Sequence, residues 1–197
     1  MLYFFDEKGQ KAAEDFNAAG RIKEYDGDYL HINDCNFAGA KSNMFIKENI
    51  EQKIEVGSDG TVTKTLTIDY KNPEPASDCN LEKGDLCLNG PYRNWFRIYV
   101  PQGSELIESS GSEVEMETYD GLGKTVFEGF FGDTHPLRPL GSAKVVLKYK
   151  LPFKIEDEYR LFIQKQPGTD GYQYSLEFED QTEEFELTTD KEIRLRR

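Results

Sequence analysis

The sequence predicts a mainly β protein, an antiparallel β-sandwich with one short N-terminal helix. The clearest signal is the period-two alternation of residues 50–72, IEQKIEVGSDGTVTKTLTIDYKN. About nine or ten short strands follow one another with turn-forming residues at close intervals, which is typical of an antiparallel sandwich. A helical pattern occurs only once, near the N-terminus, so a parallel sheet with crossover helices is not expected.

Residues 50–72 are expected to form a β-hairpin. One parity of its second half carries Val62, Leu66, Ile68 and Tyr70, and threonines alternate with them. This alternation predicts a strand with one buried face. Upstream, Ile50, Ile54 and Val56 share a parity. The intervening Gly57-Ser58-Asp59-Gly60 is typical of a turn that needs positive φ.

The N-terminal part predicts one helix and one short strand. Residues 6–20 place Asp6 at a helix N-cap and Gly20 where a left-handed C-terminal residue belongs. Residues 25–33 alternate as a short strand. We assign residues 1–43 to an N-terminal segment with a helix and a short strand, and residues 44–197 to the sandwich domain.

The rest of the chain alternates between strands and turns. Residues 71–93 contain three prolines and two cysteines, which predicts a long irregular excursion. The later strands are expected at 94–100, 113–118, 142–151, 159–164 and 172–178, followed by short strands up to the C-terminus.

Charge and hydropathy exclude several classes of protein. The 197 residues carry 24 Lys and Arg against 37 Asp and Glu, a formal net charge of -13. A field of this sign repels phosphate backbones, so no nucleic-acid partner is expected. The apolar run at residues 1–5 is too short for a membrane span or a signal sequence. An aromatic content of 13% requires a buried core.

Three cysteines occur, at positions 35, 79 and 87. Cys79 and Cys87 flank CNLEKGDLC, whose turn residues can bring the two thiols together. A disulfide between them is one interpretation, and two reduced thiols in an exposed loop is the other.

Known catalytic and metal-binding patterns are not met. Gly39-Ala40-Lys41-Ser42 lacks the glycine spacing of a phosphate-binding loop. The acidic residues 78–85 lack the glycine and the final glutamate of a calcium loop. His31 and His135 lack zinc-ligand spacing. We therefore predict no catalytic residue, no metal and no cofactor.

Trp95, Arg97 and Tyr99 are the candidate ligand-binding residues, because they share one face of the strand at 94–100. Aromatic side chains on a rigid strand could form a platform for a sugar ring or a protein partner. The more ordinary interpretation is that this face is the inner side of a second layer.

Motifs throughout the chain carry a family resemblance. They are Phe4-Phe5-Asp6, Gln10, Asn17-Ala18-Ala19-Gly20-Arg21-Ile22, Asp28-Tyr29-Leu30, Asn33, Asn36, Gly39, Lys41-Ser42-Asn43, Gly60, Thr67, Tyr70, Asn72, Pro101-Gln102-Gly103-Ser104, the strand end at 149–152 and Gln164-Lys165-Gln166-Pro167-Gly168. With these motifs the chain resembles the C-terminal part of an uncharacterised family of membrane-anchored extracytoplasmic proteins from candidate-phyla bacteria, a domain of unknown function. It departs from the family at Ala38-Gly39-Ala40, where adjacent glycines are usual, and at Cys35.

The resemblance implies a location at the cell surface, with membrane attachment only through an N-terminal anchor that this chain lacks. It also implies that residues 1–43 are the remnant of a preceding α/β region. An oxidising exterior favours the Cys79–Cys87 disulfide. We therefore predict a structural or interaction domain, not an enzyme, whose partner is an envelope protein or a glycan. One alternative is a carbohydrate-binding module that uses the aromatic strand face. Another is the C-terminal part of a cell-envelope enzyme whose active site lies upstream.

Overall fold

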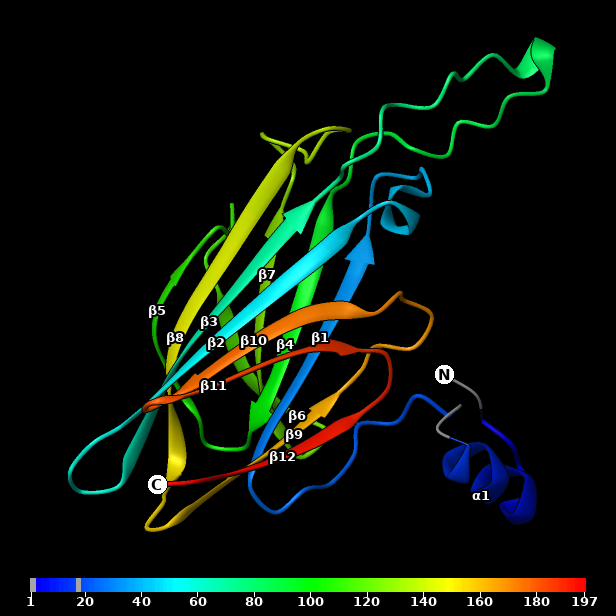
Figure 1. Cartoon of the computed structure of the whole chain (residues 1–197). Helices are drawn as coiled ribbons and strands as arrows, with labels where there is room; N and C mark the ends of the chain where they lie inside the picture. The colour runs from blue at the N-terminus through cyan, green and yellow to red at the C-terminus, as the bar shows by residue number, and fades with distance from the viewer. Residues whose placement is uncertain (1–2, 17–18) are drawn as a thin grey trace.

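The computed structural model describes residues 3–16 and 19–197, and shows two β-sheets packed face to face with one helix outside them (Figure 1). The first sheet has the order β12 (Lys191–Arg196), β9 (Glu158–Gln164), β1 (Asp28–Asn36), β4 (Asn94–Pro101), β7 (Lys124–Phe131), β6 (Glu117–Gly121). The second has the order β11 (Gln181–Leu187), β10 (Tyr172–Phe178), β2 (Lys47–Val56), β3 (Thr61–Lys71), β8 (Ser142–Lys154), β5 (Glu105–Ser110). The helix is α1 (Glu7–Asp15), and two short 3₁₀ turns are η1 (Ser42–Met44) and η2 (Leu81–Lys83). The predicted β-sandwich is confirmed.

The predicted hairpin is formed by β2 and β3. Ile50 pairs with Ile68, and both side chains are fully buried in the core between the sheets. The turn needs Gly60, whose φ is +82° and whose missing Cβ would lie 2.5 Å from the carbonyl oxygen of Ile155. The buried face of β3 also contains Lys64, a charged residue with no exposed surface.

The sheets are not purely antiparallel, which corrects one part of the fold prediction. β1 pairs with β9 in parallel, and β2 pairs with β10 in parallel. Parallel neighbours cannot be joined by a tight turn, and in both pairs more than a hundred residues separate the two strands in the sequence.

The N-terminal boundary also needs correction. β1 lies inside the first sheet between β9 and β4, so the sandwich includes this strand and does not begin at residue 44. The helix begins as predicted, with the Asp6 carboxylate accepting a 2.7 Å hydrogen bond from the Gly9 amide. It ends at Asp15 and is shorter than residues 6–20. Residues 17–18 of that prediction, which are also part of the family motif, lie outside the described residues.

Two connections pass from the first sheet to the second at the same end of the sandwich. Residues 37–46 join β1 to β2, and residues 165–171 join β9 to β10 (Figure 1). Gln166 attaches the second connection to the end of β1, because its side chain accepts from the Asp34 amide at 2.8 Å and donates to the Asp34 carbonyl at 3.0 Å. This end of the sandwich is called the crossover end below.

A long arm, residues 72–93, projects from the crossover end (Figure 1). Asn89 fixes its base by donating to the Pro75 carbonyl at 2.8 Å, and Ser42 Oγ accepts from the Gly90 amide at 3.0 Å. Further out, Cys79 and Cys87 form a disulfide, with their Cα atoms 4.4 Å apart. Cys35 is a free, exposed thiol.

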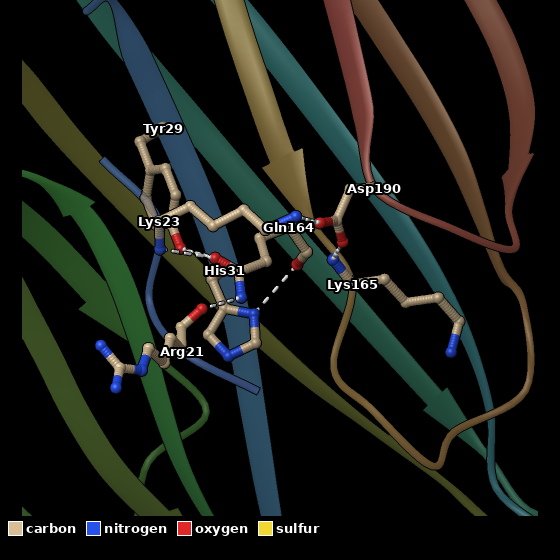
Figure 2. Close-up of polar contacts among 7 residues, drawn as sticks. All are labelled: Arg21, Lys23, Tyr29, His31, Gln164, Lys165 and Asp190. Atoms are coloured by element: carbon tan, nitrogen blue, oxygen red, sulfur yellow. Dashed lines mark hydrogen bonds and ion pairs between the residues drawn. The ribbon is translucent and has the colours of Figure 1, made fainter. Parts of the chain in front are cut away.

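The chain that precedes β1 lies across the outer face of the first sheet, as Figure 2 shows. Gln164 accepts from the Lys23 amide at 3.0 Å and donates to the Arg21 carbonyl at 2.7 Å. His31 Nδ1 donates to the Gln164 carbonyl at 2.9 Å, and burial lowers the pKa of this imidazole. His31 is thus a structural residue with a satisfied ring nitrogen.

Candidate functional site

The aromatic strand face lies on the outside of the first sheet. Phe96, Ile98 and Val100 of β4 are fully buried in the core, so Trp95, Arg97 and Tyr99 point away from it and are partly exposed. The interpretation of this face as the inner side of a second layer is therefore wrong. Strand alternation was correctly predicted, but alternation alone does not say which parity faces the core.

The three candidate residues of this face have different ring and ion-pair partners, although Trp95 and Arg97 both lie close enough to Glu128 to lower its pKa. The Trp95 ring lies between Phe37 and Phe130, with ring centroids 6.1 and 5.7 Å away. Arg97 forms an ion pair with Glu128, which also accepts from the Tyr119 hydroxyl at 2.8 Å. The Tyr99 ring lies 5.6 Å from the His31 ring. The structure does not bring the three side chains together around one cavity.

A pocket of about 480 Å³ opens at the crossover end, between the two sheets. Both crossover connections contribute to its wall, and the strands below them contribute its floor. The residues that matter most are Asp34, Met44, Glu48, Tyr92, Pro167 and Tyr172. The pocket therefore combines apolar and aromatic side chains with three carboxyl groups, since Asp170 also lines it beside Asp34 and Glu48.

Asp34 comes from the inner face of β1. Its Oδ1 atom accepts from the Tyr70 hydroxyl at 2.9 Å and from the Asn94 side-chain amide. Its Oδ2 atom is buried and has no hydrogen-bond partner among the described residues. Burial raises the pKa of Asp34 to about 6, although the two hydrogen bonds to Oδ1 oppose the rise.

Glu48 comes from the inner face of β2, directly opposite Tyr70 in the hairpin register. Its side chain is only 7% exposed, and the described residues offer no hydrogen bond to its Oε2 atom. Burial, followed by the negative charge of Asp34, raises its pKa well above the ordinary value. The nearby Tyr172 hydroxyl opposes this rise only in part.

The charge of this carboxyl pair is not balanced by the ion pairs of the described residues. Lys47, beside the pocket, pairs with Asp170 at 2.9 Å. Lys165 donates to the Thr169 carbonyl at 2.6 Å. The pair is thus held in a low-dielectric pocket without a protein cation, an arrangement that is costly unless something else compensates for it.

Among residues 3–16 and 19–197, no group of three or more His, Cys, Asp and Glu side chains is placed to hold a metal ion. No helix in that part of the chain is long and apolar enough to cross a membrane.

Asp34 and Glu48 match no known catalytic or metal-binding spacing, so motif patterns do not identify them. The sequence feature that marks both residues is their position on the inward-facing side of a strand. Asp34 continues the inward parity of Leu30 and Ile32, and Glu48 continues that of Ile50 and Ile54. Acidic residues on the apolar parity of a strand mark a buried polar site.

Comparisons with known proteins give only distant likenesses. No protein-family model matches the chain, and no curated protein matches it. Among solved structures, a candidate nutrient binding protein from Legionella pneumophila matches with a TM-score of 0.40 and 9% identity over 76% of this chain. An M1 zinc metallopeptidase from Deinococcus radiodurans matches with a TM-score of 0.30 and 11% identity over 66% of this chain. The matched regions span 54% and 31% of those two chains. At these values the likenesses carry no argument about function.

Proposed function

We propose that this protein is a non-catalytic, extracytoplasmic binding domain that takes a small organic cation into the pocket at the crossover end. The observation that carries the proposal is the Glu48 Oε2 atom, which is buried at the pocket and without a partner among the described residues. A buried carboxylate oxygen needs a donor or a positive charge, and a ligand with an ammonium group supplies both.

The lining favours an organic cation over a metal ion. Tyr92 and Tyr172 offer aromatic surface, and Met44 and Pro167 offer apolar contact to the carbon part of a ligand. An ammonium group over an aromatic ring gains cation–π attraction, which is strongest when water is excluded. A divalent metal ion prefers a compact shell of oxygen ligands, and no group of three or more His, Cys, Asp and Glu side chains among the described residues is placed to form one.

The disulfide and the family resemblance support the extracytoplasmic location. Cys79 and Cys87 are bridged, and structural disulfides persist in oxidising compartments. The envelope partner, in this proposal, is a molecule or a polymer end that bears a free amine. The proposal retains the expectation that the domain has no nucleic-acid partner, because a chain of net charge -13 repels polyanions.

Calorimetric titration with glucosamine and butylamine tests the proposal, with glucose and butanol as neutral counterparts of the same shape. We expect the amines to bind and the neutral compounds not to bind. Affinity should strengthen as the pH rises from about 5 to about 7, because the Asp34 carboxyl group ionises over that range while both amines remain largely protonated. The groups that face the pair are tyrosines, and burial raises their pKa values above this range.

Matched variants assign the binding to the pocket. Glu48→Gln and Asp34→Asn keep the shape of each side chain and should each weaken amine binding at least tenfold, roughly 1.4 kcal/mol. Glu51→Gln is the control, because Glu51 lies on the exposed face of the same strand. Equal binding of glucosamine and glucose, or an affinity unchanged in Glu48→Gln, would contradict the proposal.

Carbohydrate binding at the outer face is a second candidate function. Phe37 is 60% exposed and lies against Trp95, so two aromatic rings of this face are open to a sugar. Binding of a neutral oligosaccharide that is lost in Trp95→Ala but kept in Glu48→Gln would favour this face over the pocket.

A further inference from the structure

Lys64 and Asp28 meet in the core, away from the pocket. Asp28 begins β1 in the first sheet and Lys64 lies in β3 of the second, so their contact crosses the interior from sheet to sheet. Both side chains have no exposed surface. The proposed binding function does not use them.

The surroundings of Asp28 differentiate its two oxygen atoms. Oδ1 accepts from the Tyr29 backbone amide at 2.8 Å. Oδ2 contacts the Lys64 ammonium group and the Tyr159 hydroxyl. One oxygen is therefore held by a fixed backbone donor, and the other lies between a nucleophile and a hydroxyl group that can transfer a proton.

Lys64 is poorly satisfied as an ammonium ion. An ammonium group has three N–H donors, and the described residues give it one hydrogen-bond partner, Asp28. The Tyr149 ring, centred 5.8 Å from Nζ, adds only a cation–π contact. Burial lowers the pKa of Lys64, which favours the neutral and nucleophilic amine.

We propose that Lys64 and Asp28 condense within the folded protein into a side-chain amide bond that covalently links the two sheets. The site would be an intramolecular cross-link, formed once per molecule and requiring no cofactor or second substrate.

The step balances as a condensation. Proton transfer within the ion pair gives a neutral amine and a neutral carboxylic acid. The Lys64 nitrogen then attacks the Asp28 carboxyl carbon, and the developing negative charge on Oδ1 is stabilised by the Tyr29 amide, as in an oxyanion hole. Oδ2 leaves as water, receiving through the Tyr159 hydroxyl the proton that the nitrogen loses. One C–N bond forms, one C–O bond breaks, and no oxidant or reductant is needed.

Intact-mass spectrometry of the full chain tests the proposal directly. The protein is first reduced, so that the Cys79–Cys87 disulfide does not affect the mass. We expect a mass lower than the sequence mass by one water molecule. A reduced protein at the full sequence mass would overturn the proposal.

Peptide mapping places the cross-link and needs no variant to fold. Trypsin does not cleave after an acylated lysine, so residues 54–71 should remain uncut at position 64 and should be joined to residues 24–41. The recovery of separate peptides 24–41 and 54–64 in full yield would contradict the bond.

Variants separate the chemistry from packing. Lys64→Met and Asp28→Ala should both restore the full sequence mass. Tyr159→Phe keeps the ring and removes the hydroxyl, so we expect slower formation, seen as a mixture of the two masses that shifts with time after folding. If Tyr159→Phe cross-links as fast as the original protein, the proposed proton transfer through Tyr159 is wrong, although the amide bond itself is still formed.

Discussion

Each end of the interior contains a buried aspartate of β1, and the two aspartates have opposite kinds of partner. At each end an aspartate of β1 reaches across the core to a residue of β3, Asp28 to Lys64 and Asp34 to Tyr70. The aspartates are six residues apart, and so are their partners, so both contacts use the same inward parity. At the first end the chain supplies the cation. At the second it supplies a hydroxyl group, and Glu48 adds a second carboxyl group in place of a cation.

The surroundings explain why one end is closed and the other is open. Tyr149 and Tyr159 fill the space around Lys64 and Asp28, and both rings are fully buried. At the crossover end two connections pass between the sheets and leave the pocket between them. A buried carboxylate needs a compensating positive charge, and under the proposed function a ligand supplies that charge in the pocket.

The largest loss of stability is expected from Lys64→Met, which removes the cation of the closed end. The change leaves the Asp28 carboxylate buried without its cation, and uncompensated buried charges cost about 3–5 kcal/mol. Chemical denaturation at neutral pH should show a loss of at least this size, because any covalent link between the sheets is lost as well.

The double variant Lys64→Met with Asp28→Leu is the matched control. An apolar pair of similar volume removes the stranded charge, so part of the lost stability should return. If the double variant were less stable than Lys64→Met alone, the loss would come from packing and not from charge.

The second predicted change in stability is smaller and concerns the open end, where Asp34 and Glu48 line the pocket. A carboxyl group whose folded pKa is raised stabilises the protein when protonated, and this contribution is lost as the pH rises from its unfolded pKa through its folded pKa. For Asp34 the loss falls between about pH 4 and pH 6. For Glu48 it continues above that range, because its folded pKa is raised well above the ordinary value.

Glu48→Gln should therefore raise the free energy of unfolding at about pH 8, by roughly 1–3 kcal/mol, and should have little effect at about pH 4. Denaturation curves at both pH values check this, with Glu51→Gln as the exposed control on the same strand. Equal effects of Glu48→Gln at both pH values would mean that the pKa of Glu48 is the same in the folded and the unfolded protein, and the contrast between the two ends would fail.

Much of the fold could be predicted from the sequence because it depends on local patterns. The alternation of Val62, Leu66, Ile68 and Tyr70 gave the inner face of β3, and all four are buried. Lys64 shares their parity and was overlooked, since a lysine in an apolar pattern is normally read as an interruption. The parallel pairs were not predictable, because they join strands that are distant in the sequence.

The candidate site was beyond local patterns for the same reason. Asp34 and Glu48 belong to different sheets, and only the crossover at residues 37–46 brings them to one pocket. The disulfide was open to inference because Cys79 and Cys87 are near neighbours in a turn-rich loop. For Trp95, strand alternation predicts the face that it shares with Arg97 and Tyr99 but not the side of the sheet on which that face lies.

The smallest effect is expected from the disulfide, which belongs to neither end of the core. Cys79 and Cys87 lie beyond the hydrogen-bonded base of the arm, and nearby Leu81 and Leu86 are 72% and 65% exposed. Because the outer arm buries so little apolar surface, it can unfold locally while the sandwich stays folded. Cys79→Ser with Cys87→Ser should change the unfolding free energy of the sandwich by less than about 1 kcal/mol while making the arm more susceptible to proteolysis.

Amine binding should be unchanged in the same variant. The 3₁₀ turn η1 holds the arm through Ser42 and lines the pocket with Met44, and it is fixed by the base of the arm and not by the disulfide. A large loss of sandwich stability or of binding would show that the arm is coupled to the open end, and the contrast between the two ends would then have to include it.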